Sequence, residues 1–408
     1  MKILLVLPRP LFPADTGGKI RTWNICQRLS DRAEIHAVSL ANRETDAAGI
    51  ARMSEAFCTY TPVPWNETPK FSPGFYVEFL RSRFGPLPYF LSKYDLEAFR
   101  KGVADLVARE SFDVVLYDFL HSAAAMPDTP GAPQVLFEHN VEYVIRRRHW
   151  ERETHPIRKW LLNAEWKKAR SVEQSVCRSV DRVIAVSEDD GRMIREEFGV
   201  PHVSVLPTGV DIQYFQPQPG QQRGNIVFVG SMDWYPNEEG ILWFLETVYP
   251  RVCQQIPDVR VTVVGRNPSA RLRQMATANA GIEVTGAVPD VRPFLARANV
   301  VIVPLRIGGG TRIKIFEAMA MERAVVSTTI GAEGLPVGHG REILLEDDAE
   351  RFAGAVVSLV RDAARCSTLG QAARAKVARD HTWESVAREM ERILQSVVEC
   401  ARPVPLEA

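Results

Sequence analysis

The 408-residue sequence lacks a charge excess, closely spaced cysteines and a long hydrophobic run at its start. Its 50 Lys and Arg residues balance 50 Asp and Glu residues, so the overall charge gives no reason to expect a nucleic-acid partner. The six cysteines include no Cys-x-x-Cys pair, which argues against a zinc site or a disulfide framework. The opening MKILLVLPRP holds only five apolar residues before Pro8, too few for a signal peptide or a membrane span. We therefore expect a cytoplasmic protein.

Two common nucleotide-binding motifs are also missing after this first expected strand. A nicotinamide oxidoreductase needs Gly-x-Gly-x-x-Gly at that point, but the chain continues as PRPLFPADTGG. A phosphate-loop nucleotidase is excluded as well, because PADTGGK has Pro13 where the first glycine of the loop belongs. We therefore look for a nucleotide site elsewhere in the chain.

What the sequence does contain is an alternation of short β-branched runs with longer helical patterns, which predicts parallel sheets. The chain is too long for one core, so we expect two doubly wound α/β domains with a cleft between the carboxyl ends of their sheets. A stretch rich in Pro, Gly and Gln at 207–225 predicts the linker. The expected divisions are 1–208, 209–383 and 384–408, and the last of these is an amphipathic helix with a tail. Strands are expected at 2–7, 34–40, 113–117, 134–137, 182–187 and 203–207, and then at 225–230, 260–265, 282–286, 300–305 and 324–328.

The sequence RIGGGTRIKIFEAMA, which starts at Arg306, contains the clearest candidate for a ligand site. A glycine-rich turn follows a buried strand and leads into a helix, expected to be capped by Thr311, whose backbone N–H groups and dipole favour a phosphate. Arg312 and Lys314 add two cations in the first turn, where they oppose the helix dipole but suit a bound anion. The alternative is that the glycines serve only a tight turn.

Glu317 is an unusual residue in that helix. The expected core-facing stripe consists of Ile313, Phe316, Ala320 and Ala324, and Glu317 falls inside it. An unpaired carboxylate there costs free energy unless its pKa shifts or it finds donors. Glu317 therefore needs a basic partner or a ligand, and the ribose hydroxyls of a nucleotide would meet that need.

The span VVIVPLRIGGGTRIKIFEAMAMERAVVSTTIGAEGL resembles the donor-binding region of the retaining glycosyltransferases of family 4, which have the GT-B fold. Other landmarks occur in the same order: DTGGKIRTWNICQRL after the first strand, FEHN, AVSEDD, LPTGVD and VFVGSMDWYPNEEG. In detail the chain is most similar to the exosortase-associated (PEP-CTERM) bacterial sugar transferases of exopolysaccharide assembly. The segment 59–101 matches no landmark.

The resemblance implies that a sugar moves from a nucleotide-diphosphate donor to an acceptor hydroxyl with retention of the anomeric configuration. It implies no cofactor and no metal, and the chain has no Asp-x-Asp pair of the kind that chelates a metal in other transferases. The C-terminal helix is expected to return to the first domain. Two alternatives stay open, namely a nucleotide-sugar epimerase with the GT-B fold and a catalytically silent subunit that binds a nucleotide sugar.

In the donor domain, Glu317 matches the second acid of the family pattern Glu-x7-Glu, which holds the ribose hydroxyls. Gly309 replaces the first acid, so contact with the donor sugar would fall to N–H groups at Gly309 and Gly310. Ser231 replaces the arginine of a Gly-Arg pair, so the charge at the diphosphate would have to come from elsewhere. We expect it to come from the start of the helix. The expected donor-binding residues are Ser231, Gly309, Gly310, Thr311, Arg312, Lys314 and Glu317.

In the first domain, His139 matches a histidine that lies beside the reacting sugar in relatives, and with Glu317 it is the expected catalytic residue. His121 is the competing candidate and is expected nearby. A lone histidine is more often structural, and that alternative stays open. Gly17 and Gly18 match a glycine turn near the diphosphate and the acceptor, where the lack of a Cβ allows close approach.

Two stretches of the first domain suggest a membrane partner. Residues 146–170 hold nine Lys or Arg against three Glu, interleaved with Trp150, Trp160 and Trp166. Residues 71–99 hold nine aromatic side chains. Cations and indoles together suit an anionic membrane surface, which predicts a lipid-linked or glycan acceptor at the inner face of the membrane. The alternative is a solvated helix face and a set of core aromatics.

Overall fold

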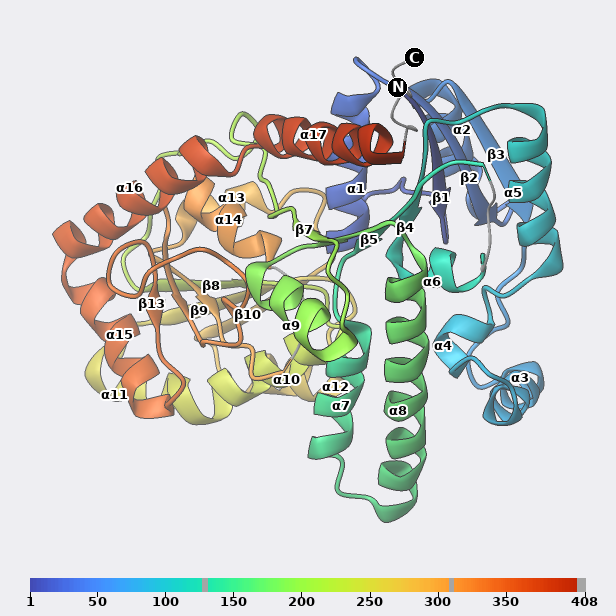
Figure 1. Ribbon diagram of the computed structural model, residues 1–408. Helices are drawn as coiled ribbons and strands as arrows, with labels where there is room; N and C mark the ends of the chain where they lie inside the picture. The colour runs from blue at the N-terminus through green and yellow to red at the C-terminus, as the bar shows by residue number, and fades with distance from the viewer. Residues whose placement is uncertain (127–130, 308–311, 402–408) are drawn as a thin grey trace. The chain divides into compact units, whose positions relative to one another are not determined.

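Two parallel sheets, each in its own part of the chain, form the framework of the protein (Figure 1). The computed structural model describes residues 1–126, 131–307 and 312–401. One unit comprises Met1–Pro207 together with Trp383–Ala408, and the other comprises Thr208–Thr382. The expected α/β class with two doubly wound sheets is confirmed.

The first sheet has seven parallel strands in the order β3-β2-β1-β4-β5-β6-β7. Strand β1 is apolar at every position after Lys2 and is almost fully buried, as a central strand between two helical layers must be. The strand order reverses between β1 and β4, so their carboxyl ends border the crevice in which doubly wound domains bind ligands. The strands are β1 Lys2–Leu7, β2 Glu34–Ala41, β3 Thr59–Pro64, β4 Val114–Asp118, β5 Gln134–Glu138, β6 Arg182–Ala185 and β7 Val203–Val205.

Strand β3 was not expected from the sequence. Its residues, TYTPVP, include Pro62 and Pro64, and proline cannot donate to a sheet ladder. Within this sheet β3 pairs with β2 alone and forms an edge, where proline is tolerated. The prolines that argue against a strand in the sequence are therefore compatible with this one.

The C-terminal helix α17, Trp383–Ala401, belongs to the first unit, as expected. It packs against α1, Gly17–Leu29, and the Arg32 guanidinium lies 2.5 Å from the Glu384 carboxylate. The other helices of the unit are α2 Ala47–Ala56, α3 Pro73–Phe84, α4 Tyr89–Ser92, α5 Glu97–Arg109, α6 Phe119–Ala124, α7 Glu142–Arg152, α8 Pro156–Ser179 and α9 Glu188–Phe198.

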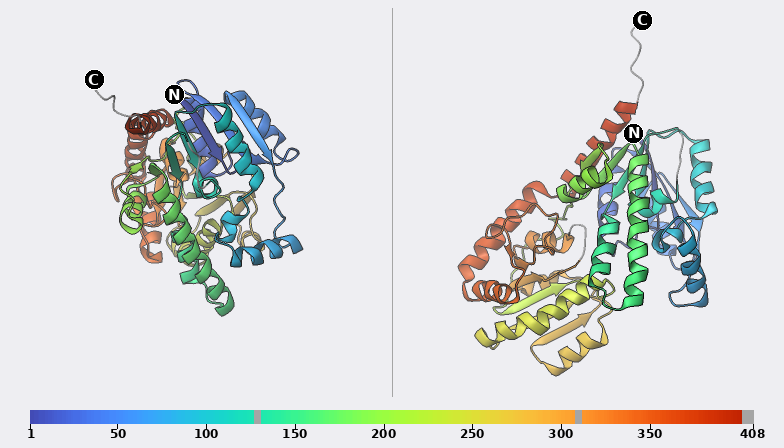
Figure 2. Two further views of the ribbon diagram at one scale, coloured as in Figure 1. Left: turned by 45° about the vertical axis from the view of Figure 1, so that its right-hand side comes forward. Right: turned by 60° about the horizontal axis from the view of Figure 1, so that its bottom comes forward.

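The basic stretch at 146–170 forms a hairpin of two helices, α7 and α8 (Figure 2). The chain leaves the helical conformation at 153–155, and Pro156 opens α8 at a position where proline is favoured. Trp150 and Trp166 pack against each other with ring centres 5.7 Å apart. Of the three tryptophans considered as membrane contacts, Trp160 is therefore the exposed one.

The second sheet has six parallel strands in the order β10-β9-β8-β11-β12-β13. They are β8 Asn225–Val229, β9 Arg260–Val264, β10 Ile282–Gly286, β11 Val300–Val303, β12 Ala324–Ser327 and β13 Leu344–Leu345. Its helices are α10 Tyr235–Trp243, the π-helical turn η1 Phe244–Val248, α11 Tyr249–Gln255, α12 Ala270–Ala278, α13 Arg292–Arg297, α14 Ile313–Ala320, α15 Ala349–Arg361 and α16 Ala363–Asp380.

The stretch expected to be a linker, 207–225, packs on the second unit for much of its length. Val210 and Phe215 are buried in the same core as Phe316. The Val210 N–H donates to the His381 carbonyl at 2.8 Å. The composition correctly indicates a segment without long helices or strands, but it does not reveal that the segment is anchored.

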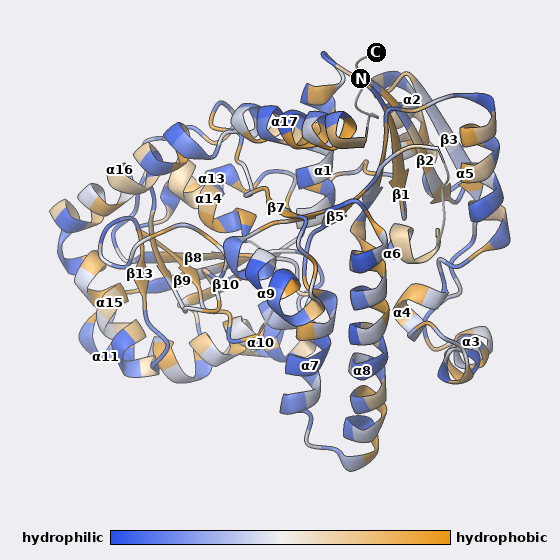
Figure 3. Cartoon of the chain, in the orientation of Figure 1, coloured by the Kyte–Doolittle hydropathy of each residue, from blue (hydrophilic) through white to orange (hydrophobic). Residues whose placement is uncertain are grey.

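Hydrophobic residues follow the strands of both sheets, and the helices carry mixed faces (Figure 3). This distribution is typical of layers in which each helix turns one side to a sheet. Across the described ranges, none of the helices combines the length and the apolar character needed to span a bilayer.

Candidate functional site

In the second unit, a lysine, an asparagine and a glycine lie in contact beyond the carboxyl end of β8. Lys314 Nζ donates to Asn237 Oδ1 at 2.7 Å, and Asn237 Nδ2 donates to the Ser231 carbonyl at 2.8 Å. A Cβ on Gly230 would lie 2.8 Å from both Lys314 Nζ and Asn237 Nδ2, so a larger residue would displace one of them. Lys314 Nζ also lies 4.7 Å from the centre of the Phe228 ring. These contacts hold a cation at the edge of the sheet.

Lys314 and Glu317 share one partly exposed face of α14, whose other residues are all buried. Burial lowers the pKa of Lys314 to about 7, and the nearby charge of Arg312 acts in the same direction. Burial raises the pKa of Glu317 to about 7, while the charge of Lys314 opposes this rise. Among the residues that the structure describes, none forms a side-chain hydrogen bond with the Glu317 carboxylate. Near neutral pH both groups can therefore change charge when a ligand arrives.

The helix differs from the sequence-based expectation in its start and in its faces. The N-cap residue of the helix is Arg312, whereas Thr311 was the expected cap. Ala324, which was expected on the helix, lies in strand β12. Glu317 does not lie on a core-facing stripe, because the helix is buried on all sides except the face that it shares with Lys314. Three residues named for donor binding lie outside the described residues: Gly309, Gly310 and Thr311.

Sequence reasoning missed Arg266, which follows β9 and stands beside Ser231. Its Nε donates to Ser231 Oγ at 3.1 Å and to Asp233 Oδ2 at 2.9 Å. A guanidinium is thus present next to the position where the family pattern has an arginine. The pairing of β8 with β9 brings Arg266 beside Ser231. A sequence motif around Ser231 could not show this, because the two residues are 35 positions apart. Arg312, for its part, is buried with its guanidinium 5.0 Å from the centre of the Trp234 ring.

In the first unit, His139 lies in a buried network at the carboxyl ends of β4 and β5. Its Nε2 is 2.7 Å from Asp118 Oδ1, and Thr22 Oγ1 donates to the same oxygen at 2.7 Å. Arg21 Nη1 lies 3.3 Å from His139 Nδ1. Burial lowers the pKa of His139, while the charge and the hydrogen bond of Asp118 oppose this shift. The Asp118 carboxylate therefore orients the imidazole, and the motif around the histidine alone could not reveal it.

Two aromatic rings enclose His139, whose side chain is only 2% exposed. The Phe119 ring stacks on it with centres 4.0 Å apart, and the Phe137 ring lies at 4.3 Å. Phe119 has φ 67°, a left-handed conformation that costs free energy in a bulky residue. A Cβ on Gly18 would lie 2.1 Å from Phe119 Cζ, so this glycine makes room for the ring. Gly17 is exposed at the start of α1.

His121, the competing candidate, lies near His139 as expected. Its ring centre is 6.0 Å from that of Phe119, and the rings of Phe90 and Tyr94 contact it at 5.5 and 5.1 Å. Burial lowers the pKa of His121 to about 3, with the charge of Arg146 acting in the same direction. His121 is therefore a neutral imidazole at physiological pH. The first unit thus brings Gly18 and both histidines together around Phe119.

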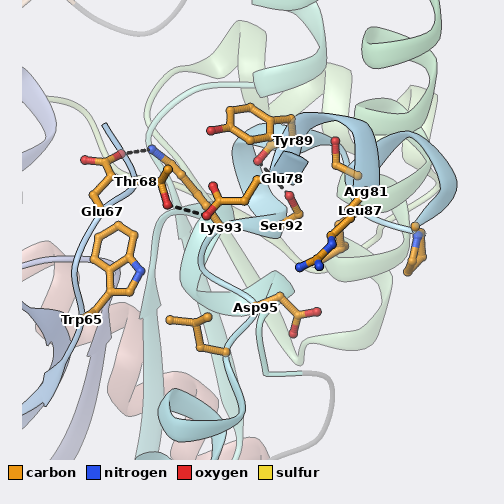
Figure 4. A pocket seen from close by; sticks show the side chains of 14 residues that line it. Trp65, Glu67, Thr68, Glu78, Arg81, Leu87, Tyr89, Ser92, Lys93 and Asp95 are labelled. Carbon is orange, nitrogen blue, oxygen red and sulfur yellow. Dashed lines mark hydrogen bonds and ion pairs between the residues drawn. The ribbon is translucent and has the colours of Figure 1, made fainter. Parts of the chain in front are cut away.

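A pocket of about 310 Å³ lies in the first unit beyond the edge strand β3 (Figure 4). Trp65 and Glu67 line it directly after that strand, and Glu78 lines it from α3. Lys93 Nζ donates to Glu67 Oε1 at 2.5 Å, and the Thr68 hydroxyl donates to the Glu78 carboxylate. An aromatic ring beside charged and hydroxyl groups is a lining that suits a polar ligand with apolar faces.

Within the described parts of the chain, no group of three or more His, Cys, Asp or Glu side chains is arranged to hold a metal ion.

Comparison with known families accounts for both halves of the chain. Residues 16–214 match the family model described as glycosyltransferase family 4, and residues 223–362 match the model described as glycosyl transferases group 1. The chain is a glycosyltransferase. The family 4 match spans the segment 59–101, for which no landmark was found in the sequence.

Two curated relatives of this glycosyltransferase show how far the similarity extends. An uncharacterized 44.6 kDa protein of the cps region of Klebsiella pneumoniae is 22% identical, covering 88% of this chain and 90% of that protein. A phosphatidyl-myo-inositol mannosyltransferase of Mycolicibacterium smegmatis is 28% identical, covering 52% of this chain and 57% of the mannosyltransferase.

Solved structures confirm the GT-B fold of the glycosyltransferase. Sucrose-phosphate synthase from Thermosynechococcus elongatus superposes with a TM-score of 0.74 at 15% identity, covering 98% of this chain and all of the synthase. The Anabaena protein HepE, solved in complex with UDP and glucose, gives a TM-score of 0.69 at 14% identity over 96% of this chain and 99% of HepE.

Proposed function

We propose that this glycosyltransferase moves a sugar from a nucleotide-diphosphate donor to an acceptor hydroxyl with retention of configuration. The observation that carries the proposal is the pair Lys314 and Glu317, which are held on one half-exposed face of α14 with pKa values near 7. A cation suited to a diphosphate and an acid suited to ribose hydroxyls stand three residues apart. The relation to HepE, a protein that binds UDP, supports the same donor class.

The diphosphate would be bound at the carboxyl edge of the second sheet. Lys314 Nζ, oriented by Asn237, would donate to phosphate oxygens, and binding of the anion would raise the lysine pKa and keep its charge. Arg266, beside Ser231, and Arg312 would add positive charge. As the bond between sugar C1 and the phosphate oxygen breaks, negative charge builds on the leaving group, so fixed cations there lower the barrier.

His139 would act beside the reacting sugar in the first unit. During transfer the bond from C1 to the departing phosphate oxygen is replaced by a bond from C1 to the acceptor oxygen, and the proton of the acceptor hydroxyl passes to the departing diphosphate. Asp118 holds the His139 imidazole in one orientation. Because Phe119 covers that ring, the side chain of Phe119 would have to shift before His139 could contact a sugar.

The pocket near β3 suits the acceptor. The pocket lies beyond the carboxyl end of β3, and His139 follows the carboxyl end of β5 in the same parallel sheet. Sugars present hydroxyls and apolar C–H faces, and Trp65 with Glu67 and Glu78 offers partners for both. We therefore propose a glycan or lipid-linked sugar as the acceptor and assembly of a cell-surface polysaccharide as the role. The resemblance to the exosortase-associated transferases supports this role.

The test is incubation of the purified protein with UDP-, GDP- and dTDP-sugars, with and without a bacterial lipid extract. We expect one donor to release its nucleoside diphosphate faster when the extract is present, and a labelled sugar to enter the lipid fraction. Interconversion of the donor sugar without transfer would identify an epimerase instead. Binding of a nucleotide sugar without any turnover would identify a silent subunit.

A further inference from the structure

Most of the exposed large apolar side chains in the described part of the chain gather on one region of the first unit. Ten such side chains are exposed, and seven of them belong to residues 71–84 or to the first turns of α8. We call these seven the apolar face. They are Phe71 at 76% exposure, Tyr76 at 57%, Val77 at 49%, Leu80 at 60%, Phe84 at 88%, Ile157 at 66% and Trp160 at 64%.

Helix α3 carries two sets of apolar side chains on different sides. Members of the apolar face recur along it at spacings of three and four residues, so they lie on one side of the helix. Phe75 and Phe79 lie on another side, where their rings pack on Tyr89 at 5.2 and 5.7 Å. The second set fastens α3 to the unit. Phe71 and Tyr76 of the apolar face contact the Phe75 ring, with ring centres 5.7 and 5.3 Å apart, and still remain exposed.

The parts of the apolar face on α3 and α8 belong to one surface. The Arg83 guanidinium lies 5.2 Å from the centre of the Trp160 ring. Lys168 Nζ donates to the carbonyls of Ser82 at 2.7 Å and Gly85 at 3.0 Å, which ties the end of α3 to the middle of α8. These contacts place the end of α3, which carries Phe84, alongside α8 between Trp160 and Lys168.

The charge around the apolar face is predominantly positive, although Arg83 is paired with Glu165 at 3.8 Å. Residues 70–84 and 155–164 contain five Lys or Arg and a single acid, Glu78. That acid lines the pocket and accepts a hydrogen bond from Thr68. The chain as a whole has equal numbers of acidic and basic residues, so this is a local excess. Apolar and aromatic side chains interleaved with cations match the boundary of an anionic bilayer, where acyl chains lie directly beneath phosphates.

We propose that the apolar face is a docking surface for an anionic lipid bilayer. Its aromatic and aliphatic side chains enter the headgroup boundary, and Lys70, Arg81, Arg83, Arg158 and Lys159 contact lipid phosphates. The proposal does not depend on the proposed sugar transfer, because docking requires no donor. Where both hold, docking brings α3, and with it one wall of the pocket, to the lipid surface.

The experiment is sedimentation with sucrose-loaded vesicles at low salt. Vesicles of phosphatidylcholine containing phosphatidylglycerol should pellet the protein, vesicles of phosphatidylcholine alone should pellet much less, and salt near 1 M should release it, since screening then acts within about 3 Å. Arg158→Gln combined with Lys159→Gln should lower partitioning by roughly 30-fold, because each cation contributes about 1 kcal/mol. Leu80→Ser combined with Phe84→Ser should weaken binding to the same vesicles.

Matched variants in the second unit keep the test specific. Arg273→Gln combined with Arg341→Gln removes two exposed cations, and Tyr235→Ser removes an exposed aromatic ring. These variants should pellet like the unaltered protein. The proposal is overturned if they lose binding as strongly as the α3 and α8 variants, or if neutral vesicles bind equally well. Failure of the protein to pellet with any vesicle at low salt would also overturn it and leave a protein partner as the occupant.

Discussion

At the residue scale, Lys314 and Glu317 make the folded protein sensitive to pH in two adjoining windows. Glu317 has a pKa raised from 4.5 to about 7, so between those values the folded state holds a proton that the unfolded state has lost. Stability therefore falls as pH rises through this window. Lys314 has a pKa lowered from 10.5 to about 7, so stability rises again above neutral pH. Burial of these two groups therefore lowers the free energy of unfolding most near pH 7. The same pH allows both groups to change charge when a charged ligand binds.

The first prediction is that Glu317→Gln stabilises the free protein at about pH 8 by about 1–2 kcal/mol and leaves its stability nearly unchanged at about pH 4. Glutamine removes the cost of ionising a partly buried acid. Urea unfolding at both pH values measures the difference. Glu283→Gln, at an exposed acid of the same unit, serves as the control. Equal stability of the wild type and Glu317→Gln at both pH values would contradict the raised pKa.

The second prediction concerns His139, whose proposed role is beside the reacting sugar. His139→Ala should lower turnover at least about tenfold, a loss of roughly 1.4 kcal/mol, with little change in affinity for the nucleoside diphosphate. His36→Ala removes another buried histidine, from β2, and should leave turnover unchanged. Steady-state kinetics combined with titration of the product would separate the two effects. An active His139→Ala beside an inactive His121→Ala would assign the role to His121.

At the element scale, the sequence predicted what depends on local pattern and missed what depends on neighbours. Continuous apolar runs identified most strands, and β1 has the expected bounds. Strand β3 was missed because Pro62 and Pro64 are tolerated only at a sheet edge, and an edge is a property of the assembled sheet. Arg266 was missed for a similar reason, since the pairing of β8 with β9 places it beside Ser231.

The third prediction tests the contact between α1 and α6. Gly18→Ala should destabilise the protein by about 1–3 kcal/mol, because its Cβ would meet the Phe119 ring at 2.1 Å and force it to move. Gly354→Ala in α15 meets no atom within 4 Å and should stabilise the protein by about 0.5–1 kcal/mol. Chemical denaturation of the two variants gives the comparison. A neutral Gly18→Ala would show that Phe119 moves freely and that the glycine is not needed for packing.

At the scale of the whole molecule, the assignment as a glycosyltransferase and the fold rest on both halves of the chain. Lys314 and Glu317, which share one face of α14, could both be named from the sequence because they lie in one contiguous stretch. The network of Asp118 and Thr22 with His139 could not, because its members come from three separate elements. The sequence could indicate the apolar face only through the aromatic and basic composition of 71–99 and 146–170. Which of those side chains are exposed depends on how the helices pack.

The central claim is that the edge of the second sheet binds the nucleoside diphosphate part of a sugar donor. The most direct measurement is calorimetric titration of the tightest-binding nucleoside diphosphate and of its parent nucleoside into wild type, Lys314→Met and Glu317→Gln. We expect Lys314→Met to weaken the diphosphate by about 1.5–3 kcal/mol with a smaller effect on the nucleoside. Glu317→Gln should weaken both ligands through the ribose. Equal losses for both ligands in Lys314→Met, or unchanged binding in both variants, would contradict the claim.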